Sequence, residues 1–242
     1  METGALAALA LGLLLGLKHA TDADHVVAVA TVVSEYRNPW RGIWIGASWG
    51  LGHSTPLLIL GTAILLVKGA LAQRYEAVAP LFEFGVAIML ILLGVQVFWN
   101  LRRRGLHLHE HVAEEEPHVH IHSHDPASEH EQEVPHGLFQ FGRPFFRLKS
   151  YLIGIVHSLA GSAAVMLLVL STDAIRSVWT GLLYIILFGL GTIVAMSFLT
   201  LLLGVPFAVS SSSRKLNRAV VVAAGAASIF FGLFLMWELA LA

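Results

Sequence analysis

Long apolar blocks separated by polar links dominate the pattern of this chain of 242 residues. Six such blocks lie at roughly 4–33, 42–68, 77–101, 150–171, 177–205 and 217–240. Each is long enough to cross about 30 Å of hydrocarbon as an α-helix. The first block is interrupted by polar residues, and most links are short. The pattern therefore predicts an all-α polytopic membrane protein with about six transmembrane helices.

The composition agrees with this prediction. Hydrophobic residues make up 56% of the chain and charged residues only 13%, whereas a soluble domain carries about 25% charged residues. A signal peptide is the alternative for the N-terminus, but its start holds an acid, Glu2, and no base, and no soluble domain follows. There is no cysteine, which excludes thiolate metal sites, and the net charge of −1 gives no indication of a nucleic-acid partner.

The two halves of the chain share motifs at matched spacing. Each half carries Gly-x-x-His, ending at His19 and at His157, and then Gly-Leu-Gly, starting at Gly50 and at Gly189. The second motif begins 34 residues after the first glycine in one half and 35 residues after it in the other. Because each half has three blocks, the second half must insert upside down. This predicts an inverted 3+3 repeat, a design common in secondary transporters whose site lies at the repeat interface.

The basic residues predict how the chain lies in the membrane. Links after the first, third and fifth blocks hold most of the lysines and arginines, whereas the opposite links hold only Lys68, Arg74 and Arg176. Basic loops stay in the cytoplasm, so both termini are expected outside and the long loop inside. We expect three regions: a first transmembrane repeat at 1–101, a cytoplasmic loop at 102–149 and a second transmembrane repeat at 150–242.

The interruption of the first block, "GLKHATDADHVVAVA", carries the candidate chemistry. It places His19, Asp22, Asp24 and His25 within a lipid-length helix, where an ionised carboxylate costs several kcal/mol. Lys18 is the only base near, and one lysine cannot neutralise two aspartates. A bound divalent cation can, and carboxylate and imidazole are the usual ligands of Ni²⁺, Co²⁺, Zn²⁺ or Mn²⁺.

The spacing of these residues favours convergence. His19, Asp22 and His25 follow one another at intervals of three, which places neighbours on one helix face. Asp24 lies about 160° from Asp22 on an ideal helix, so it points elsewhere unless the helix unwinds, or it orients a ligating imidazole. A polar helix-packing patch and a proton relay without metal are the alternatives.

Two further intramembrane histidines are candidate ligands. His53 lies within the second block among small residues, and His157 matches His19 in the repeat. Either histidine could instead be an interhelical hydrogen-bond partner. The predicted metal-binding residues are therefore His19, Asp22, Asp24, His25, His53 and His157, with no catalytic residues.

The long loop is rich in histidine and acid. Residues 105–136 hold nine histidines and eight acids, a composition that cannot bury a core and that predicts disorder. Alternating histidines, as in "HVHIHSH", suit weak chelation of divalent metals. The alternative is a solvated or pH-sensitive tether.

These residues resemble a known family. "HATDADH" fits the His-x4-Asp-His signature of the NiCoT nickel/cobalt permeases at His19, Asp24 and His25, and "GLGHST" resembles their second motif at His53. "GIVHSLAGSAA" resembles the small UreH-like branch, which is linked with urease and vitamin B12 genes. The resemblance implies transport of Ni²⁺ or Co²⁺ across the bacterial cytoplasmic membrane, with no prosthetic group. It points to those four residues as metal-handling, with Asp22 inside the same motif, and to a metallochaperone or urease or cobalamin pathway proteins as partners.

We therefore expect an uptake permease that works by alternating access, and not an enzyme. An exporter of the same ions is the first alternative, because the ligands do not encode direction. A membrane-embedded metalloenzyme is another, but no His-Glu-x-x-His or comparable catalytic set is present. A membrane scaffold that delivers metal to a partner is the last, but it does not explain aspartates at mid-bilayer.

Overall fold

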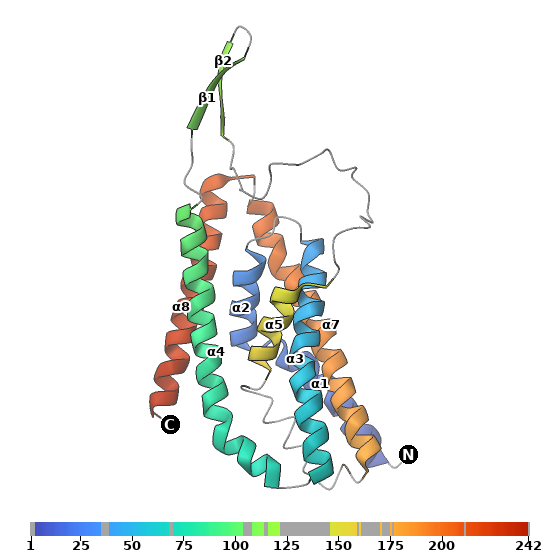
Figure 1. The fold of residues 1–242 in the computed structure, drawn as a ribbon. Coiled ribbons are helices and arrows are strands. Elements are labelled where there is room, and N and C mark those ends of the chain that lie inside the picture. The colour runs from blue at the N-terminus through green and yellow to red at the C-terminus, as the bar shows by residue number, and fades with distance from the viewer. Residues whose placement is uncertain are drawn as a thin grey trace.

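The computed structural model describes residues 3–34, 39–67, 70–103, 108–113, 116–121, 146–158, 160, 170, 175, 177–210 and 212–241. With labels as in Figure 1, the helices are α1 (Thr3–His19), α2 (Ala23–Val33), α3 (Trp40–Val67), α4 (Ala70–Arg103), α5 (Leu148–His157), α7 (Val178–Ser210) and α8 (Arg214–Leu241). The strands are β1 (Leu108–Ala113) and β2 (Glu116–Ile121).

The long helices match the predicted apolar blocks. Within the described residues, four helices are long and apolar enough to span a membrane: α3, Ala77–Arg102 of α4, α7 and α8. α1 and α2 together form a further candidate span, bent by 53° at the break between them. The predicted block 150–171 is described only in part, because α5 covers its beginning and residues 161–169 lie outside the described residues. The prediction of a polytopic helical membrane protein agrees with this architecture, and the sixth span stays a prediction.

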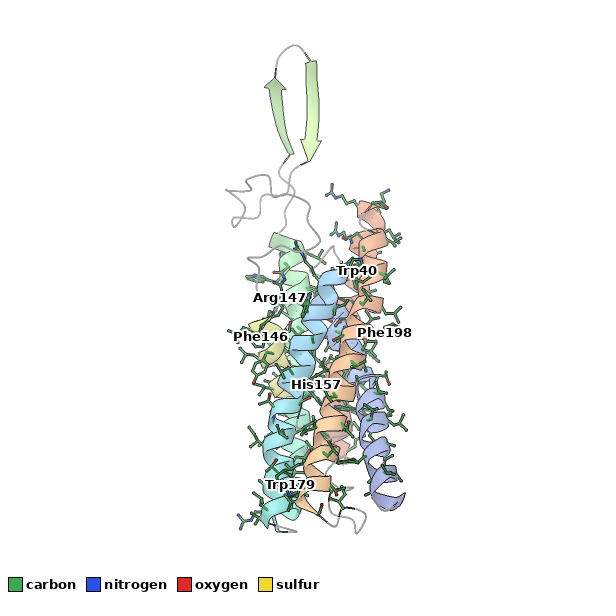
Figure 2. All side chains as sticks on the ribbon, turned by 90° about the vertical axis from the view of Figure 1, so that its right-hand side faces the viewer. Trp40, Phe146, Arg147, His157, Trp179 and Phe198 are labelled. Carbon is green, nitrogen blue, oxygen red and sulfur yellow. The ribbon has the colours of Figure 1, made fainter. Side chains whose placement is uncertain are left out.

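Tryptophans mark the two ends of the bundle. Trp40 begins α3 and is 69% exposed, and Trp179, in the first turn of α7, is 81% exposed. They lie at opposite ends with His157 between them (Figure 2). Tryptophan prefers the membrane–water interface, and large apolar side chains such as Phe198 face outward between the ends. These features place His157 at the depth of the hydrocarbon.

Two helix crossings in the bundle have the same geometry, because in each a glycine lies against a backbone carbonyl of the facing helix. A Cβ atom on Gly16 of α1 would lie 2.1 Å from the carbonyl oxygen of Phe188 on α7. A Cβ atom on Gly154 of α5 would lie 2.2 Å from the carbonyl oxygen of Trp49 on α3. Only glycine allows backbones to approach so closely. Gly16 and Gly154 open the repeated Gly-x-x-His motifs, and Trp49 and Phe188 precede the repeated Gly-Leu-Gly motifs. The same two motif positions therefore meet at both crossings, and each crossing joins one half of the chain to the other.

The remaining long helices complete the bundle. α3 and α7 pack along each other, and α4 and α8 pack together, with the Ser228 hydroxyl donating a 2.7 Å hydrogen bond to the Leu90 carbonyl. Because α1 packs on α7 and α5 packs on α3, the helices of 1–101 and 150–242 interlock. The two predicted repeats therefore share two apolar clusters, each with residues from both halves.

A β-hairpin lies between α4 and α5, within the loop for which disorder is predicted. β1 and β2 pair antiparallel, with Leu108 opposite Ile121 and His109 opposite His120. The sequence "LHEHV" and "HVHI" alternates histidine with Leu, Glu, Val and Ile, and this period of two is typical of a strand. These two strands lie within residues 105–136, and the disorder expected for that loop stays a prediction. Residues 122–145 lie outside the described residues.

Candidate functional site

The site is built at the break between α1 and α2. α1 ends at His19, and Asp22 has an extended backbone (φ −62°, ψ 147°) at the N-cap of α2. The Asp22 amide donates to the His19 carbonyl at 3.0 Å, which closes the last turn of α1 before the chain bends. Asp24 lies in the first turn of α2, where the positive end of the helix dipole stabilises a carboxylate. The break thus turns Asp24 toward the histidines, which an unbroken helix would not do.

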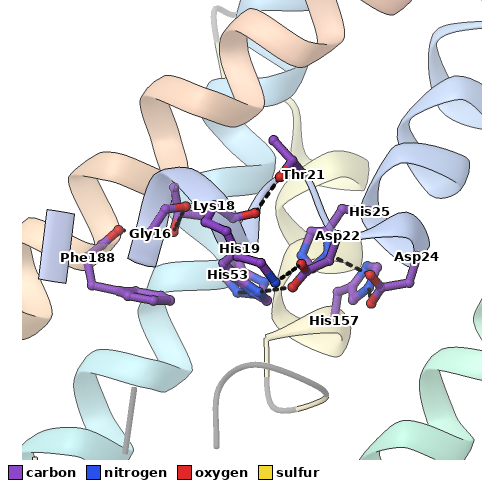
Figure 3. A network of polar contacts seen from close by, with 11 residues as sticks. Gly16, Lys18, His19, Thr21, Asp22, Asp24, His25, His53, His157 and Phe188 are labelled. Atoms are coloured by element: carbon purple, nitrogen blue, oxygen red, sulfur yellow. Dashed lines mark hydrogen bonds and ion pairs between the residues drawn. The ribbon is translucent and has the colours of Figure 1, made fainter. Parts of the chain in front are cut away.

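Three buried imidazoles converge at this break (Figure 3). His19 from α1, His25 from α2 and His53 from α3 each offer a ligand atom within 4.8 Å of the others. The Nε2 atoms of His19 and His53 lie 2.6 Å apart. All three side chains are buried, with 2% of His19 exposed and 0% of the other two. At 2.6 Å the Nε2 atoms of His19 and His53 share a hydrogen bond, and such a group of nitrogen atoms has the residue types of a transition-metal site.

Two of these rings, those of His19 and His25, each contact a carboxylate through Nδ1. Asp22 Oδ2 lies 3.0 Å from His19 Nδ1, and Asp24 Oδ1 lies 3.1 Å from His25 Nδ1. A carboxylate can only accept, so each Nδ1 carries the proton, and each Nε2 keeps its lone pair. Nε2 of His25 is buried without a hydrogen-bond partner. This carboxylate–histidine arrangement is the usual support of a metal-binding imidazole.

Asp24 also contacts the second half of the chain. Its Oδ2 atom lies 2.7 Å from Nε2 of His157, at the end of α5. The rings of His25 and His157 stack with centroids 4.0 Å apart. Asp24, His25 and His157 form a second set of ligand atoms within 4.8 Å of one another. The structure therefore brings all six predicted residues to one cluster.

The two aspartates have different charge partners. Asp22 pairs with Lys18, whose Nζ lies 2.6 Å from Oδ1. In the described part of the chain, the ion-pair partners of Asp24 are the imidazoles of His25 and His157. A carboxylate at this depth needs a compensating positive charge. Neutral imidazoles do not supply it, whereas a bound cation does.

Two aromatic rings lie against the cluster, and neither was among the residues predicted from the sequence. Phe188 of α7 stacks on His19 with centroids 5.7 Å apart. Trp49 of α3 lies beside His157 with centroids 6.0 Å apart. Both side chains are fully buried or nearly so, each within a separate apolar cluster. The match between "WGLG" and "FGLG" was the signal that could have found this pair.

The contacts of Asp24 with the imidazoles of His25 and His157 lead to a prediction. Asp24→Asn keeps the shape of the side chain but removes the carboxylate that fixes the two imidazoles. We expect nickel affinity to fall about 10- to 100-fold, as is common when such a partner is lost. Equilibrium dialysis of nickel against the purified protein measures this, with Glu238→Gln on the exposed side of α8 as the matched control. Equal affinity in Asp24→Asn and Glu238→Gln would contradict the role.

Comparison with known proteins identifies relatives of this chain. Residues 5–207 match the NicO family, described as "High-affinity nickel-transport protein". Urease accessory protein UreH of Bacillus sp. (strain TB-90) is 36% identical over 235 residues, which cover 97% of this chain and 92% of that protein.

Two nickel transporters match over shorter stretches. The high-affinity nickel transport protein of Cupriavidus necator is 30% identical over 109 residues, 39% of this chain and 31% of that protein. Nickel transporter NicT of Mycobacterium tuberculosis is 32% identical over 110 residues, 37% of this chain and 29% of that protein. No solved structure matches. From the extent of the family match and the near full-length similarity to UreH, this chain belongs to the NicO family of nickel-transport proteins.

Proposed function

We propose that this chain is an uptake permease for Ni²⁺, with Co²⁺ as a second substrate of the same site. The family is one of transporters and not of enzymes, and nickel is the transported substrate rather than a prosthetic group. The observation that carries the proposal is the buried cluster of His19, His25 and His53 with carboxylates on two outer nitrogens. Nitrogen and oxygen ligands without sulfur suit Ni²⁺ and Co²⁺ and disfavour soft metals.

In this proposal the three Nε2 atoms of His19, His25 and His53 hold the ion. Asp22 and Asp24 keep the first two imidazoles in the tautomer that binds metal, and their negative charge offsets part of the charge of the ion. Burial of the rings excludes water and the hydrated alkali ions that compete poorly for nitrogen. His157 lies against this position and is treated further below.

Alternating access of an inverted 3+3 repeat explains how the ion crosses. The support is the pair of equivalent crossings at Gly16 and Gly154. Phe188 and Trp49 lie near these crossings, and α3 and α7 begin at opposite ends of the bundle (Figure 2). In this proposal Phe188, which stacks on His19, and Trp49, which lies beside His157, are the two rings that close the site in turn. Rocking one repeat against the other would withdraw one ring at a time.

The proposed location is the cytoplasmic membrane of a bacterium, with the hairpin end inside. Basic side chains gather at the hairpin end of the described helices: Arg41, Arg102, Arg147, Lys149, Arg214, Lys215 and Arg218. Cytoplasmic ends of membrane proteins carry this excess. Both termini then lie outside, and the histidine-rich loop faces the cytoplasm, where it captures imported metal. The printed name of UreH further supports urease maturation proteins, or a metallochaperone, as recipients of the metal.

Cysteine labelling tests this orientation. The chain has no cysteine, so Ser177→Cys before α7 and Ser212→Cys before α8 each give one reactive thiol at an exposed position. An impermeant maleimide added to intact spheroplasts should label Ser177→Cys and not Ser212→Cys. Permeabilised cells should label both. Labelling of Ser212→Cys alone in intact spheroplasts would reverse the orientation.

Growth at high nickel separates uptake from export by the same fold. Expression of an importer raises cytoplasmic nickel and should sensitise cells, whereas an exporter protects them. We expect sensitisation that disappears in the His25→Ala variant. If the wild-type chain instead protects cells from nickel, the proposal of uptake is wrong and the chain exports the ion.

A further inference from the structure

The cluster contains two sets of ligand atoms that share one ring. The first is His19, His25 and His53, and the second is Asp24, His25 and His157. His25 is stacked on His157 and lies edge-on to His19, with centroids 4.0 and 4.5 Å apart. We propose that the protein holds one nickel ion at either of two adjacent positions, one at each set, and never at both. This inference rests on the proposed function and adds a step to it.

The two positions use different nitrogens of His25. Nδ1 faces Asp24 at 3.1 Å, so Nδ1 is the atom that joins Asp24 and His157 around an ion. Nε2 of His25 is then the nitrogen that binds an ion at the first position, and it is buried without a hydrogen-bond partner. Nδ1 of His157 is also buried without a partner, so it can carry the ring proton when Nε2 binds metal.

Occupancy is exclusive because a neutral imidazole has one lone pair. An ion at the first position requires the proton of His25 on Nδ1, where Asp24 accepts it. An ion at the second position requires that proton on Nε2. Binding both ions at once would demand an imidazolate, which loses a further proton. His25 keeps one proton in both states, and only the nitrogen that carries it changes.

Asp24 changes its role between the two states. At the first position it orients His25 and His157 by hydrogen bonds, and at the second it binds the ion directly. The ion therefore moves from a set drawn wholly from the first half of the chain to a set that includes α5 of the second half. Relative movement of the halves at the Gly154 crossing can then favour one position over the other, because His157 follows Gly154 by three residues on α5.

Nickel binding by the purified full-length chain tests the inference. The variants are His157→Ala, which removes the second position, and His19→Ala combined with His53→Ala, which removes the first. Dialysis is carried out in a full-length parent whose nine loop histidines within residues 105–136 are replaced by alanine, and it should give one nickel per chain for this parent and for both variants made in it. X-ray absorption should show three imidazoles on nickel in His157→Ala and two imidazoles with a carboxylate in the double variant. Uptake should be lost in both variants.

The outcomes separate this inference from the proposed function. Two nickel ions per chain in the parent without loop histidines would overturn exclusive occupancy. Loss of binding in the double variant would overturn the second position, and loss of binding in His157→Ala would overturn a first position that is complete without His157. If the double variant fails to fold, His53→Ala alone replaces it. Adding His157→Ala to that variant should then change the X-ray absorption spectrum of the bound nickel, because His157 is one of its ligands. A wild type that neither binds nor transports nickel would overturn the proposed function itself.

Discussion

Replacing His25 by alanine is expected to abolish nickel uptake while the protein still inserts in the membrane. His25 contributes to both sets of ligand atoms, so its loss leaves neither set complete. Loss of a supporting partner already costs about 10- to 100-fold in metal affinity, and loss of a direct ligand should cost at least about 100-fold. Uptake by cells, divided by the amount of protein in the membrane, measures the effect.

The matched control is His130→Ala, which removes a histidine from the loop between α4 and α5. Uptake should stay at the wild-type level in this variant. Normal uptake by His25→Ala at normal protein level would remove the cluster from the transport path.

Placing alanine at Gly154 is expected to weaken the protein and stop transport. The added Cβ would lie 2.2 Å from the carbonyl oxygen of Trp49 and 2.8 Å from the amide nitrogen of His53. Backbone atoms cannot change rotamer to make room, so α5 must move away from α3. Overpacking costs about 1–3 kcal/mol, which corresponds to a decrease of about 2–12 °C in Tm for a chain of this size. The displaced α5 also carries His157 away from Asp24.

Gly85 offers a matched control for this experiment. It lies within α4, and a Cβ there would have nothing within 4 Å, so Gly85→Ala should preserve Tm and uptake. Thermal unfolding of the purified variants in detergent gives the comparison. A Gly154→Ala protein as stable and as active as Gly85→Ala would contradict the claim that a Cβ atom at this crossing displaces α5 from α3.

The sequence predicted the helices well because lipid imposes a simple rule on them. The predicted block 42–68 agrees with α3 to within two residues at each end. The block 177–205 begins one residue before α7 and ends five residues before it. Polar residues in such blocks stand out, so the histidines and aspartates of the site were also identified from the chain alone. Resemblance to a family narrowed the expected metal from several divalent ions to Ni²⁺ or Co²⁺.

The pairing of these residues could not be predicted from the chain. Asp24 lies on the wrong face of an ideal helix, and only the break after His19 turns it toward His25. Its contact with His157 joins residues 133 positions apart and depends on the crossing at Gly154. Helical periodicity describes one helix at a time, whereas this contact follows from the packing of several.

Uptake of radioactive nickel into proteoliposomes that contain only the purified chain tests the central claim most directly. The wild type should accumulate nickel over time with saturation, and His25→Ala in matched vesicles should stay at the level of protein-free vesicles. Accumulation by both proteins alike would contradict a site built on His25. No accumulation by the wild type, in either orientation or with a proton gradient, would contradict the account of this chain as a self-sufficient nickel transporter.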